Sequence, residues 1–324
     1  MIERHALPPP NPPRLSGETM SAEAKRSEEN AWPPLPVNEW EPTRATLHMW
    51  TQIVGKVRLA LAPRVNHWWQ VALYVNTRGL TTSPIPYGAG GFEIQFDFLK
   101  HILEIHTCDG ATAVLDLAPR AVADFYSNFM HSLDSLGINV KIWPMPVEIP
   151  NPIRFDQDRV HASYDAMYAN RFWRVLVSVD SVFKEFRSRF IGKSSPVHFF
   201  WGSFDLAVTR FSGRRAPERL GADAMTREAY SHEVISGGFW PGNEGVSDAA
   251  FYAYAAPESP GFAKSPVRTV AAAYNTQLSE FILPYEDVRR SADPRAALLD
   301  FLQSTYDAAA SLGSWDRASL DRPS

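Results

Sequence analysis

The sequence predicts an α+β protein in which two pseudo-equivalent units form curved antiparallel sheets packed against helices. Apolar residues spaced three and four positions apart predict amphipathic helices, and short alternating segments between polar turns predict strands. These segments follow one another in the same order twice along the 324 residues. Each predicted unit therefore consists of a helix, about four strands and a closing helix.

Four helices frame the two units. The first, over 43–61, carries an apolar stripe that runs from Leu47 to Leu61 and should end at Pro63. Its counterpart, over roughly 173–190, is predicted to begin near Asp156 or Asp158, either of which would cap it, and to end near Gly192. The closing helices, 119–136 and 294–312, both open near Pro-Arg-Ala and stop at Leu-Gly.

The first strand of each unit carries a shared signature. "HWWQVALYVNTRG" starts at His67 and "HFFWGSFDLAVTRFSG" at His198, and both reach a Thr-Arg pair. The second is one residue longer, which a β-bulge before Thr209 would absorb. We therefore predict an internal duplication that places His67 over His198 and Arg78 over Arg210. The expected organisation is a disordered tail (1–30), a first unit (31–142), a second unit (143–316) and a C-terminal tail (317–324).

The tail over 1–30 is rich in proline and charge and almost free of aromatic residues, which is typical of disorder. It has no apolar core segment of the kind found in secretory signals. We expect its deletion to leave the melting temperature nearly unchanged, and a drop of several degrees would contradict that expectation.

Composition, net charge and cysteine content limit the classes of protein to which the chain can belong. Hydrophobic residues make up 45% and charged residues 21% of the chain, as in ordinary globular proteins, and the net charge of −4 gives no indication of nucleic-acid binding. No segment reaches the roughly 18 consecutive apolar residues of a membrane span. Cys108 is the only cysteine, which excludes an intramolecular disulfide and favours a cytoplasmic location. It is either a small buried residue or a thiol nucleophile served by His106.

The stretch from His198 to Pro217 carries charges through an apolar strand. We predict that Asp205 pairs with Arg210 or Arg214, because an unpaired buried charge is costly. The pair would either pin two strands or position an anion site built from Arg210, Ser212 and Arg214.

Other polar residues suggest further site candidates. His67 and His198 are either ligands or acid-base groups, or residues that hold neighbouring carbonyl groups. His232 and Glu233 are adjacent, although successive strand residues face opposite ways. Trp240, in the glycine-rich stretch over 237–245, is predicted to cover a pocket as part of a lid, whereas "YGAGGF" over 87–92 reads as a turn between strands.

No motif assigns a reaction or a cofactor. The histidine and carboxylate spacings fit no metal site, so none is predicted, and the chain lacks phosphate-cradling and G-x-S-x-G motifs.

Several long segments carry a family resemblance. "WPPLP", "NHWWQVALYV", "TRGLTTSPIPYG", "HFFWGSFDLAVTRFSGRRAP", "GGFWPG" and "EFILPYEDVR" together resemble DUF5996, a bacterial family of unknown function, over residues 32–316. The resemblance implies a bacterial, cytoplasmic protein and brings no activity or catalytic residue with it. The element order is also similar to TATA-binding-protein-like folds, a likeness that implies nothing about DNA binding.

Two functions from different classes are compatible with these residues. The first is a ligand-binding protein whose aromatic-lined pocket holds the acidic or polar end of a small molecule, with Arg210, Arg214, His198, His67, Arg78 and Trp240 at the site. The second is an enzyme in which His198 or His232 acts as general base, oriented by Asp205 or Glu233, with arginine stabilising negative charge. A small molecule is the expected partner, without nucleic acid or membrane, and the oligomeric state is not predicted.

Overall fold

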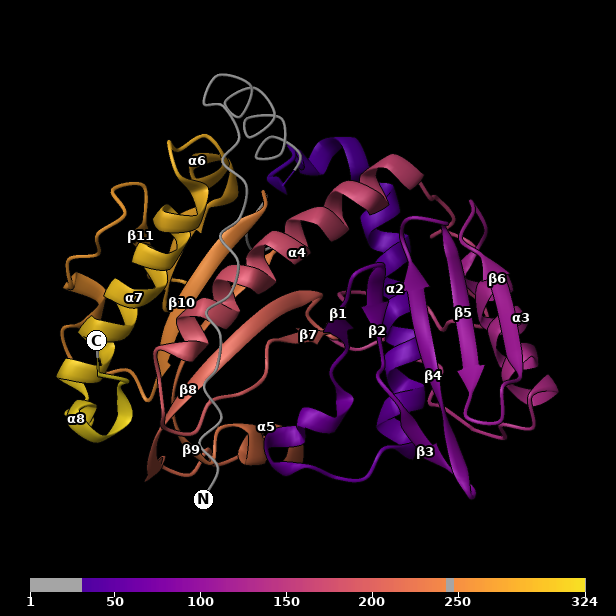
Figure 1. Cartoon of the computed structure of the whole chain (residues 1–324), viewed down its shortest axis with the longest axis horizontal. Helices are drawn as coiled ribbons and strands as arrows, with labels where there is room; N and C mark the ends of the chain where they lie inside the picture. Colours follow the sequence, from indigo (N-terminus) through magenta and orange to yellow (C-terminus); the bar gives the residue numbers. More distant parts are fainter. Residues whose placement is uncertain (1–30, 243–247, 324) are drawn as a thin grey trace, which may run out of the picture.

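Two antiparallel sheets of six strands each form the protein in the computed structural model, which describes residues 31–242 and 248–323 (Figure 1). The tail predicted over 1–30 lies outside the described residues. The first sheet has the order β1-β2-β4-β5-β6, with β3 paired to β4. Its strands are β1 (Tyr74–Val75), β2 (Gly79–Thr81), β3 (Ile85–Tyr87), β4 (Gly90–Asp97), β5 (Ile102–Thr107) and β6 (Thr112–Asp116).

The second sheet has the order β11-β12-β10-β9-β8-β7. Its strands are β7 (His198–Phe200), β8 (Asp205–Arg215), β9 (His232–Trp240), β10 (Ala250–Ala256), β11 (Ala273–Asn275) and β12 (Glu280–Pro284). The fold is therefore mixed α and β with two antiparallel sheets, as the sequence predicts at that level. Each sheet has six strands rather than the expected four.

Helices precede and follow each sheet in the chain. They are α2 (Val37–Leu61), α3 (Val122–Ser135), α4 (Ala166–Ser188), α5 (Ala224–Ala229), α6 (Tyr285–Arg289), α7 (Pro294–Leu312) and α8 (Arg317–Leu320), with 3-10 helices η1 (Asn66–Val71) and η2 (Phe262–Lys264). The bounds of α7 match the predicted closing helix. The cap of α4 is Asp165, which accepts from the backbone of Met167 and Tyr168, so the predicted start near Asp156 or Asp158 is wrong.

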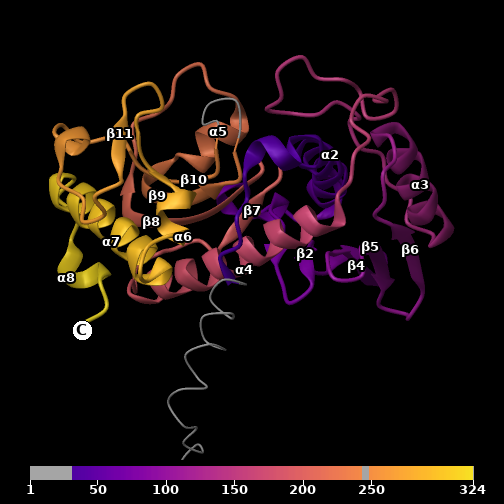
Figure 2. The ribbon, with the colours of Figure 1, turned by 90° about the horizontal axis from the view of Figure 1, so that it is seen from above.

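Each sheet has its own pair of long helices packed against it. Helix α4 contacts β8 and α7, while α7 contacts β9 and β10, so these two helices cover one face of the second sheet. Helices α2 and α3 pack together and contact β3 and β6 of the first sheet. Figure 2 shows α4 running along both halves, with α2 beside it at the middle of the molecule. One hydrophobic core extends through both halves, from Trp32 to Trp315.

The two sheets meet at a single antiparallel bridge between Leu73 and Phe199. Each residue donates its N–H to the carbonyl group of the other at 2.9 Å. The first strands of the two halves thus adjoin. The face of the second sheet that α4 and α7 do not cover borders the cavities described below.

His67 does not open a strand as predicted. It lies in η1 with φ of 59°, next to Trp68 at 60°, whereas His198 opens β7. The backbone turns sharply at His67 because both residues adopt the left-handed conformation. The proposed superposition of these two histidines therefore fails locally.

The structure also defines two peripheral features, the C-terminal residues and Cys108. Residues 317–323 pack on the body: the N–H groups of Ile191 and Gly192 bond to the carbonyl group of Leu320, and the Tyr306 hydroxyl donates to Asp321. Cys108 is exposed at the end of β5 rather than buried, and His106 interacts with Glu104 instead of the thiol.

Candidate functional site

The face of the second sheet away from α4 and α7 lines a partly open cavity. Alternate residues of a strand face the same side, and the lining follows that rule: Asp205, Ala207, Thr209 and Phe211 of β8, then Val234, Ser236 and Trp240 of β9, Tyr252 and Tyr254 of β10, and Glu280 of β12. We call this cavity, of about 300 Å³, the inner chamber.

Small residues opposite Tyr252 let its ring lie flat over the sheet. Tyr252 pairs in register with Gly238, which pairs with Ala207. A Cβ atom on Gly238 would stand 2.1 Å from the Tyr252 ring, so only glycine fits there. The Tyr252 hydroxyl consequently reaches Asp205, to which it donates a hydrogen bond.

Asp205 is the most deeply buried acid of the inner chamber. Its carboxylate accepts from the hydroxyl groups of Ser203 and Tyr252. Burial raises the pKa of Asp205 to about 6, even though both hydrogen bonds act to lower it. The carboxyl group is therefore buried, and no cation acts on it among the described residues.

Two further carboxyl groups face the same chamber. Burial and the neighbouring Asp205 raise the pKa of Glu280 to about 7, and they also raise the pKa of Glu148. One oxygen of Glu280 is buried and finds no hydrogen-bond partner within the described residues. No lysine or arginine is among the described residues that line the inner chamber. The lining itself is thus acidic, and the Lys193 ammonium group, which is not part of it, lies 5.4 Å from the ring centre of Trp69 and 4.9 Å from that of Phe211.

Aromatic rings surround these acids. Trp69, Phe200, Phe211, Tyr230, Trp240, Tyr252 and Tyr254 all line the inner chamber. The rings of Trp240 and Tyr252 have centroids 4.4 Å apart. Hydroxyl groups of Thr209 and Ser236 lie 2.9 Å apart, and those of Tyr230 and Tyr254 lie 3.0 Å apart.

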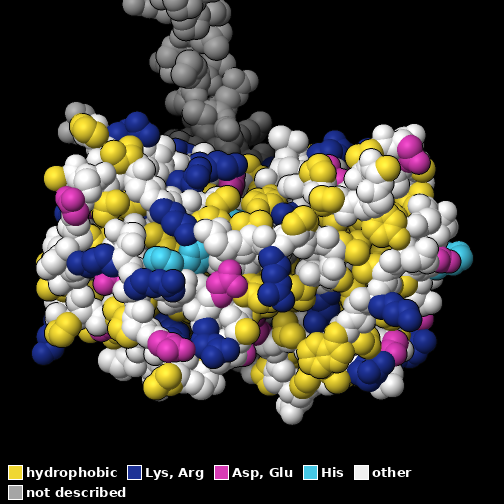
Figure 3. All heavy atoms as spheres, turned by 90° about the horizontal axis from the view of Figure 1, so that it is seen from below, with side chains coloured by type: hydrophobic (Ala, Val, Ile, Leu, Met, Phe, Trp, Pro, Cys, Tyr) yellow, Lys and Arg dark blue, Asp and Glu magenta, His cyan; other side chains and the backbone are white. Residues whose placement is uncertain are grey.

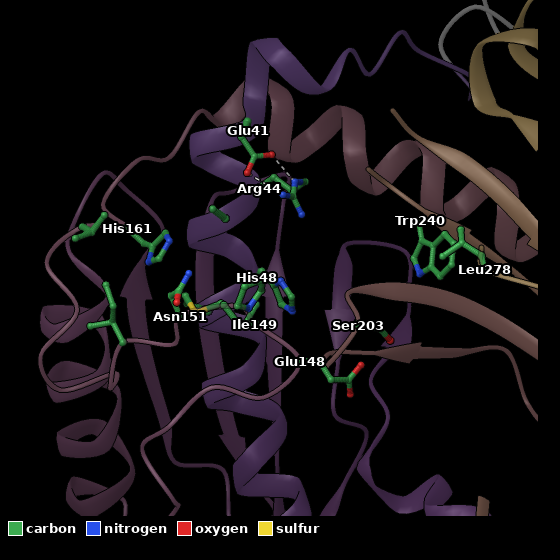
Figure 4. Close-up of a pocket in the computed structure, with 15 residues that line it drawn as sticks. Glu41, Arg44, His48, Glu148, Ile149, Asn151, His161, Ser203, Trp240 and Leu278 are labelled. Atoms are coloured by element: carbon green, nitrogen blue, oxygen red, sulfur yellow. Dashed lines mark hydrogen bonds and ion pairs between the residues drawn. The ribbon is translucent and has the colours of Figure 1, made fainter. Parts of the chain in front are cut away.

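A larger cavity, the outer chamber, adjoins the inner one. It has a volume of about 670 Å³ and shares Glu148, Ser203 and Trp240 with the inner chamber. Figure 4 shows Glu148 and Ser203 near one another, with Trp240 to one side and His48, Asn151 and His161 along the cavity. The two chambers therefore adjoin, and we refer to them together as the cleft.

Helix α2 fixes the backbone segments at the junction of the chambers. His48 donates through Nε2 to the carbonyl oxygens of Trp201 (3.0 Å) and Gly202 (2.8 Å). One helical turn later, Gln52 bonds at 2.9 Å to both the N–H and the carbonyl group of Val147. Burial lowers the pKa of His48 to about 4, so this ring is neutral at pH 7.

The segments that α2 holds are close together and locally strained. A Cβ atom on Gly202 would lie 2.4 Å from a carboxylate oxygen of Glu148, so glycine permits this close approach. Glu148 and Phe204 have φ of 57° and 58°, which costs energy for residues with a side chain. Such strain is typical of backbone that places functional groups.

A histidine oriented by a buried acid lies at the far end of the outer chamber. The Nδ1–H group of His161 donates to the carboxylate of Asp158 at 2.6 Å, and Asp158 is fully buried. This hydrogen bond raises the pKa of His161 despite partial burial. Arg44 and Glu41 line the same chamber and form an ion pair with each other.

The predicted pair of Asp205 with Arg210 or Arg214 is absent. The pairing of β8 with β9 stays regular from Leu206 to Phe211, and its irregularity lies beyond Phe211 rather than before Thr209. Asp205 and Arg210, five positions apart, therefore face opposite sides of the sheet. Arg214 pairs instead with Glu233 at 2.7 Å.

Arg210 packs into the core on the helix side of the sheet. Its guanidinium group lies 3.5 Å from the ring centre of Phe186 and 4.2 Å from that of Tyr306, and it donates to the Phe186 carbonyl group. Burial lowers the pKa of Arg210 to about 10. It takes no part in the cleft.

The other predicted site residues are dispersed. His198 is buried among Trp69, Tyr74 and Phe200, and neither ring nitrogen has a hydrogen-bond partner in the described part of the chain. Burial lowers its pKa to about 3. Three more lie outside the cleft: Arg78 bonds to Asp97, the Ser212 hydroxyl accepts from Arg214 N–H, and His232 opens β9 beside Glu233.

Three predicted site residues do line the cleft: His67, Asp205 and Trp240. The stretch over 237–245, predicted to be a lid, is strand β9 as far as Trp240, and 243–247 lie outside the described residues. The turn predicted over 87–92 does join β3 and β4.

The sequence analysis missed Glu148, Tyr252, Glu280 and the Asp158–His161 pair. Alternation in "AFYAYAA" marks Tyr252 and Tyr254 as sharing a face, and the D-x-x-H spacing marks Asp158 and His161 as neighbours. Nothing local marks Glu148 or Glu280, because tertiary structure alone brings them to Asp205.

The described residues contain neither a cluster of metal ligands nor a helix that could span a membrane. Within 31–242 and 248–323, no three histidine, cysteine or acidic side chains are grouped as metal ligands. In the same residues, no helix is both long enough and apolar enough to cross a membrane.

Of the comparisons with known proteins, the one with family models finds a match. The family model described as "Family of unknown function (DUF5996)" matches residues 32–322, which is nearly the whole chain. No curated protein and no solved structure matches significantly. The chain therefore belongs to the DUF5996 family, as the long aromatic segments of its sequence indicate.

Proposed function

We propose that the protein binds a small organic molecule whose cationic, amine-like end enters the inner chamber. The observation that carries the proposal is the convergence of Asp205, Glu148 and Glu280 among aromatic rings, with no lysine or arginine in the described lining. Asp205 is buried, Glu280 is half-buried and Glu148 is exposed, and a carboxylate withdrawn from water without a counter-charge gains most from a bound cation. Tryptophan and tyrosine faces add cation–π attraction of up to about 2 kcal/mol in a dry site.

This proposal changes the expected ligand from acidic to basic. The sequence analysis assigned an acidic end to Arg210 and Arg214, and neither lines a chamber. The rest of the ligand would extend past Trp240 into the outer chamber, where the lining combines apolar side chains with His48 and Asn151.

The test compares three probes of similar shape: phenethylamine, phenethyl alcohol and phenylacetate. We expect the amine alone to raise the melting temperature of the wild-type protein. Asp205→Asn and Glu280→Gln should weaken its binding, measured by calorimetry, by about tenfold, the worth of a charged hydrogen bond. The control is Asp116→Asn, an exposed carboxylate of β6. Stronger stabilisation by phenylacetate would overturn the proposal.

A second candidate function is acid–base catalysis in the outer chamber. The favouring observation is that buried Asp158 orients His161, as in sites where a carboxylate holds a general base. In this candidate enzyme His161, rather than His198, is the base, and Glu148, which lines the same chamber, is the proton donor.

Turnover of a panel of esters, amides and phosphoesters tests this candidate. We expect His161→Ala to abolish any activity found, and Asp158→Asn to reduce it and shift its pH profile. His198→Ala serves as the control because His198 lines neither chamber. Activity that survives His161→Ala but not His198→Ala would restore the assignment made from the sequence.

We also infer that the two halves are repeats of one unit. Both halves follow the order helix, antiparallel meander, helix, and the first strands of the meanders meet antiparallel at Leu73 and Phe199. An experimental structure in which β1-β2-β4-β5 does not superpose on β7-β8-β9-β10 would contradict the inference, as it would the TATA-binding-protein-like arrangement.

A further inference from the structure

A second, open cavity of about 510 Å³ lies where η1, α5 and the start of β9 meet. Lys193, Arg215, Arg227 and His232 line it, together with His67. Figure 3 shows this face, where adjoining histidine side chains are surrounded by lysine and arginine side chains. We call it the basic cavity.

Hydrogen bonds hold Lys193 in place and fix the tautomer of His67. The Nδ1 atom of His67 lies 3.1 Å from the carbonyl oxygen of Glu228, so it must carry the proton. The Nε2 atom is then an acceptor, and the ammonium group of Lys193 donates to it at 2.6 Å. Partial burial lowers the pKa of Lys193, and its ammonium group has two more N–H donors for a ligand.

The cations of the basic cavity lack acidic partners. Within the described residues, no ion pair includes Lys193, Arg215 or Arg227. Glu218 and Glu228 also line the cavity, but neither lies within ion-pair distance of these cations. By contrast, most other arginines near the surface, such as Arg214, are paired.

The lowered pKa values of the two histidines indicate an excess of positive charge around them. Their ring centroids are 5.6 Å apart. Burial lowers the pKa of both His67 and His232, and the nearby Lys193 lowers both further. An anion placed among these groups would reverse the electrostatic part of those shifts.

We propose that the basic cavity binds a phosphate-type oxyanion, either free phosphate or the phosphate group of a small monoester. Lys193, which His67 holds in place, the exposed Arg215 and Arg227, and the imidazole of His232 provide donors from different elements, which suits a group with three acceptor oxygens. The basic cavity shares only His67 with the described lining of the inner chamber, so the amine proposal can fail without affecting this one.

Calorimetry with inorganic phosphate at constant ionic strength is the primary test. We expect saturable binding that weakens about tenfold in Lys193→Ala and in Arg215→Gln, the effect of losing a charged hydrogen bond. Lys264→Ala, which removes an exposed charge outside the cavity, should bind like the wild type. Tighter binding of glycerol 3-phosphate would identify a monoester as the ligand, and equal binding would identify free phosphate.

The pH dependence provides a separate readout with sulfate, whose charge stays constant over the range. The charged groups facing His232 are Lys193, Arg215 and Arg227, together with Glu218 and Glu228, and His67 also faces it. Sulfate should bind more tightly as pH falls and His232 becomes protonated, and bound sulfate should raise the NMR-measured pKa of His232. Unsaturable binding, acetate binding as tight as phosphate, or unchanged His232 resonances would each overturn the proposal.

Discussion

Asp205 and Arg210 are charged residues of one strand that lie in opposite environments. Asp205 faces the acidic chamber and Arg210 faces the helices. Because the two charges do not neutralise one another, the effect of each on the free energy of unfolding can be measured separately.

We predict that the free energy of unfolding of Asp205→Asn, measured relative to the wild type at the same pH, is higher at pH 7.5 than at pH 4. Asp205 has a pKa of about 6 in the folded protein against 3.8 as the ordinary value, so the unfolded chain releases this proton first as pH rises. Folding stability therefore falls between about pH 4 and pH 6, by about 3 kcal/mol, and asparagine removes that loss. Urea denaturation at both pH values measures the difference, and an equal loss of stability at both would contradict it.

We predict that Arg210→Lys lowers the free energy of unfolding by about 2 kcal/mol, because lysine cannot keep the stacking of the guanidinium plane on Phe186 and Tyr306. Binding of phenethylamine should stay unchanged in this variant. Arg159→Lys is the matched control: its pair with Asp124 is exposed on both sides, so we expect a change within about 0.5 kcal/mol. Equal effects of the two substitutions would show that stacking contributes little.

The sequence was sufficient to select Asp205 and Arg210 as unusual but not to pair them correctly. The length difference between the two strand signatures suggested a bulge before Thr209, which would have brought both residues to one face. The irregularity lies after Phe211 instead. Strict alternation, the simpler interpretation, gives the observed faces.

At the scale of elements, helix α2 supports the cleft through both polar and steric contacts. His48 and Gln52 hold the backbone around Gly202 and Val147. One turn further, Gly55 leaves space for the Trp201 ring, whose Nε1–H donates to the carbonyl group of Val71 at 2.7 Å. The helix thus positions the turn between β7 and β8.

We predict that Gly55→Ala destabilises the protein by about 1–3 kcal/mol, the usual cost of overpacking. Alanine normally stabilises a helix interior by up to about 1 kcal/mol relative to glycine, but here its Cβ atom would lie 2.2 Å from Trp201. A double-mutant cycle with Trp201→Val should recover part of the loss. A stabilising Gly55→Ala substitution would mean that the indole ring moves freely.

Elements with strong local signals were predictable, and those set by tertiary contacts were not. The closing helix α7 matches its predicted bounds because proline opens it and glycine follows it. His67 and the two aromatic residues after it read as a strand, but contacts with α5 fold them into η1. Glu280 and Glu148 enter the site from distant parts of the chain.

At the scale of the whole molecule, the two halves share one core and are bridged by α4. Phe172 of α4 contacts Trp40 from the first half and Phe204 from the second. This packing leaves neither sheet with a complete core of its own. Family membership and the mixed two-sheet fold could be predicted from the sequence; the position of the cleft could not, because it depends on how the sheets meet.

We therefore predict one cooperative thermal transition for the full chain. Calorimetric and van't Hoff enthalpies should agree. A fragment spanning 143–324 should lack a cooperative transition, because it loses the Trp40 and Trp50 side of the core. Two separate transitions, or a fragment that folds alone, would show that the halves are independent domains.

The exposed Cys108 is well placed for spectroscopy. It is the only thiol of the chain, and the shallow depression beside it shares no lining residue with either chamber. A maleimide dye attached there would label the first sheet at one defined point without obstructing the cleft. Energy transfer from such a dye to a fluorescent amine would report directly, on single molecules, when the acidic chamber is filled.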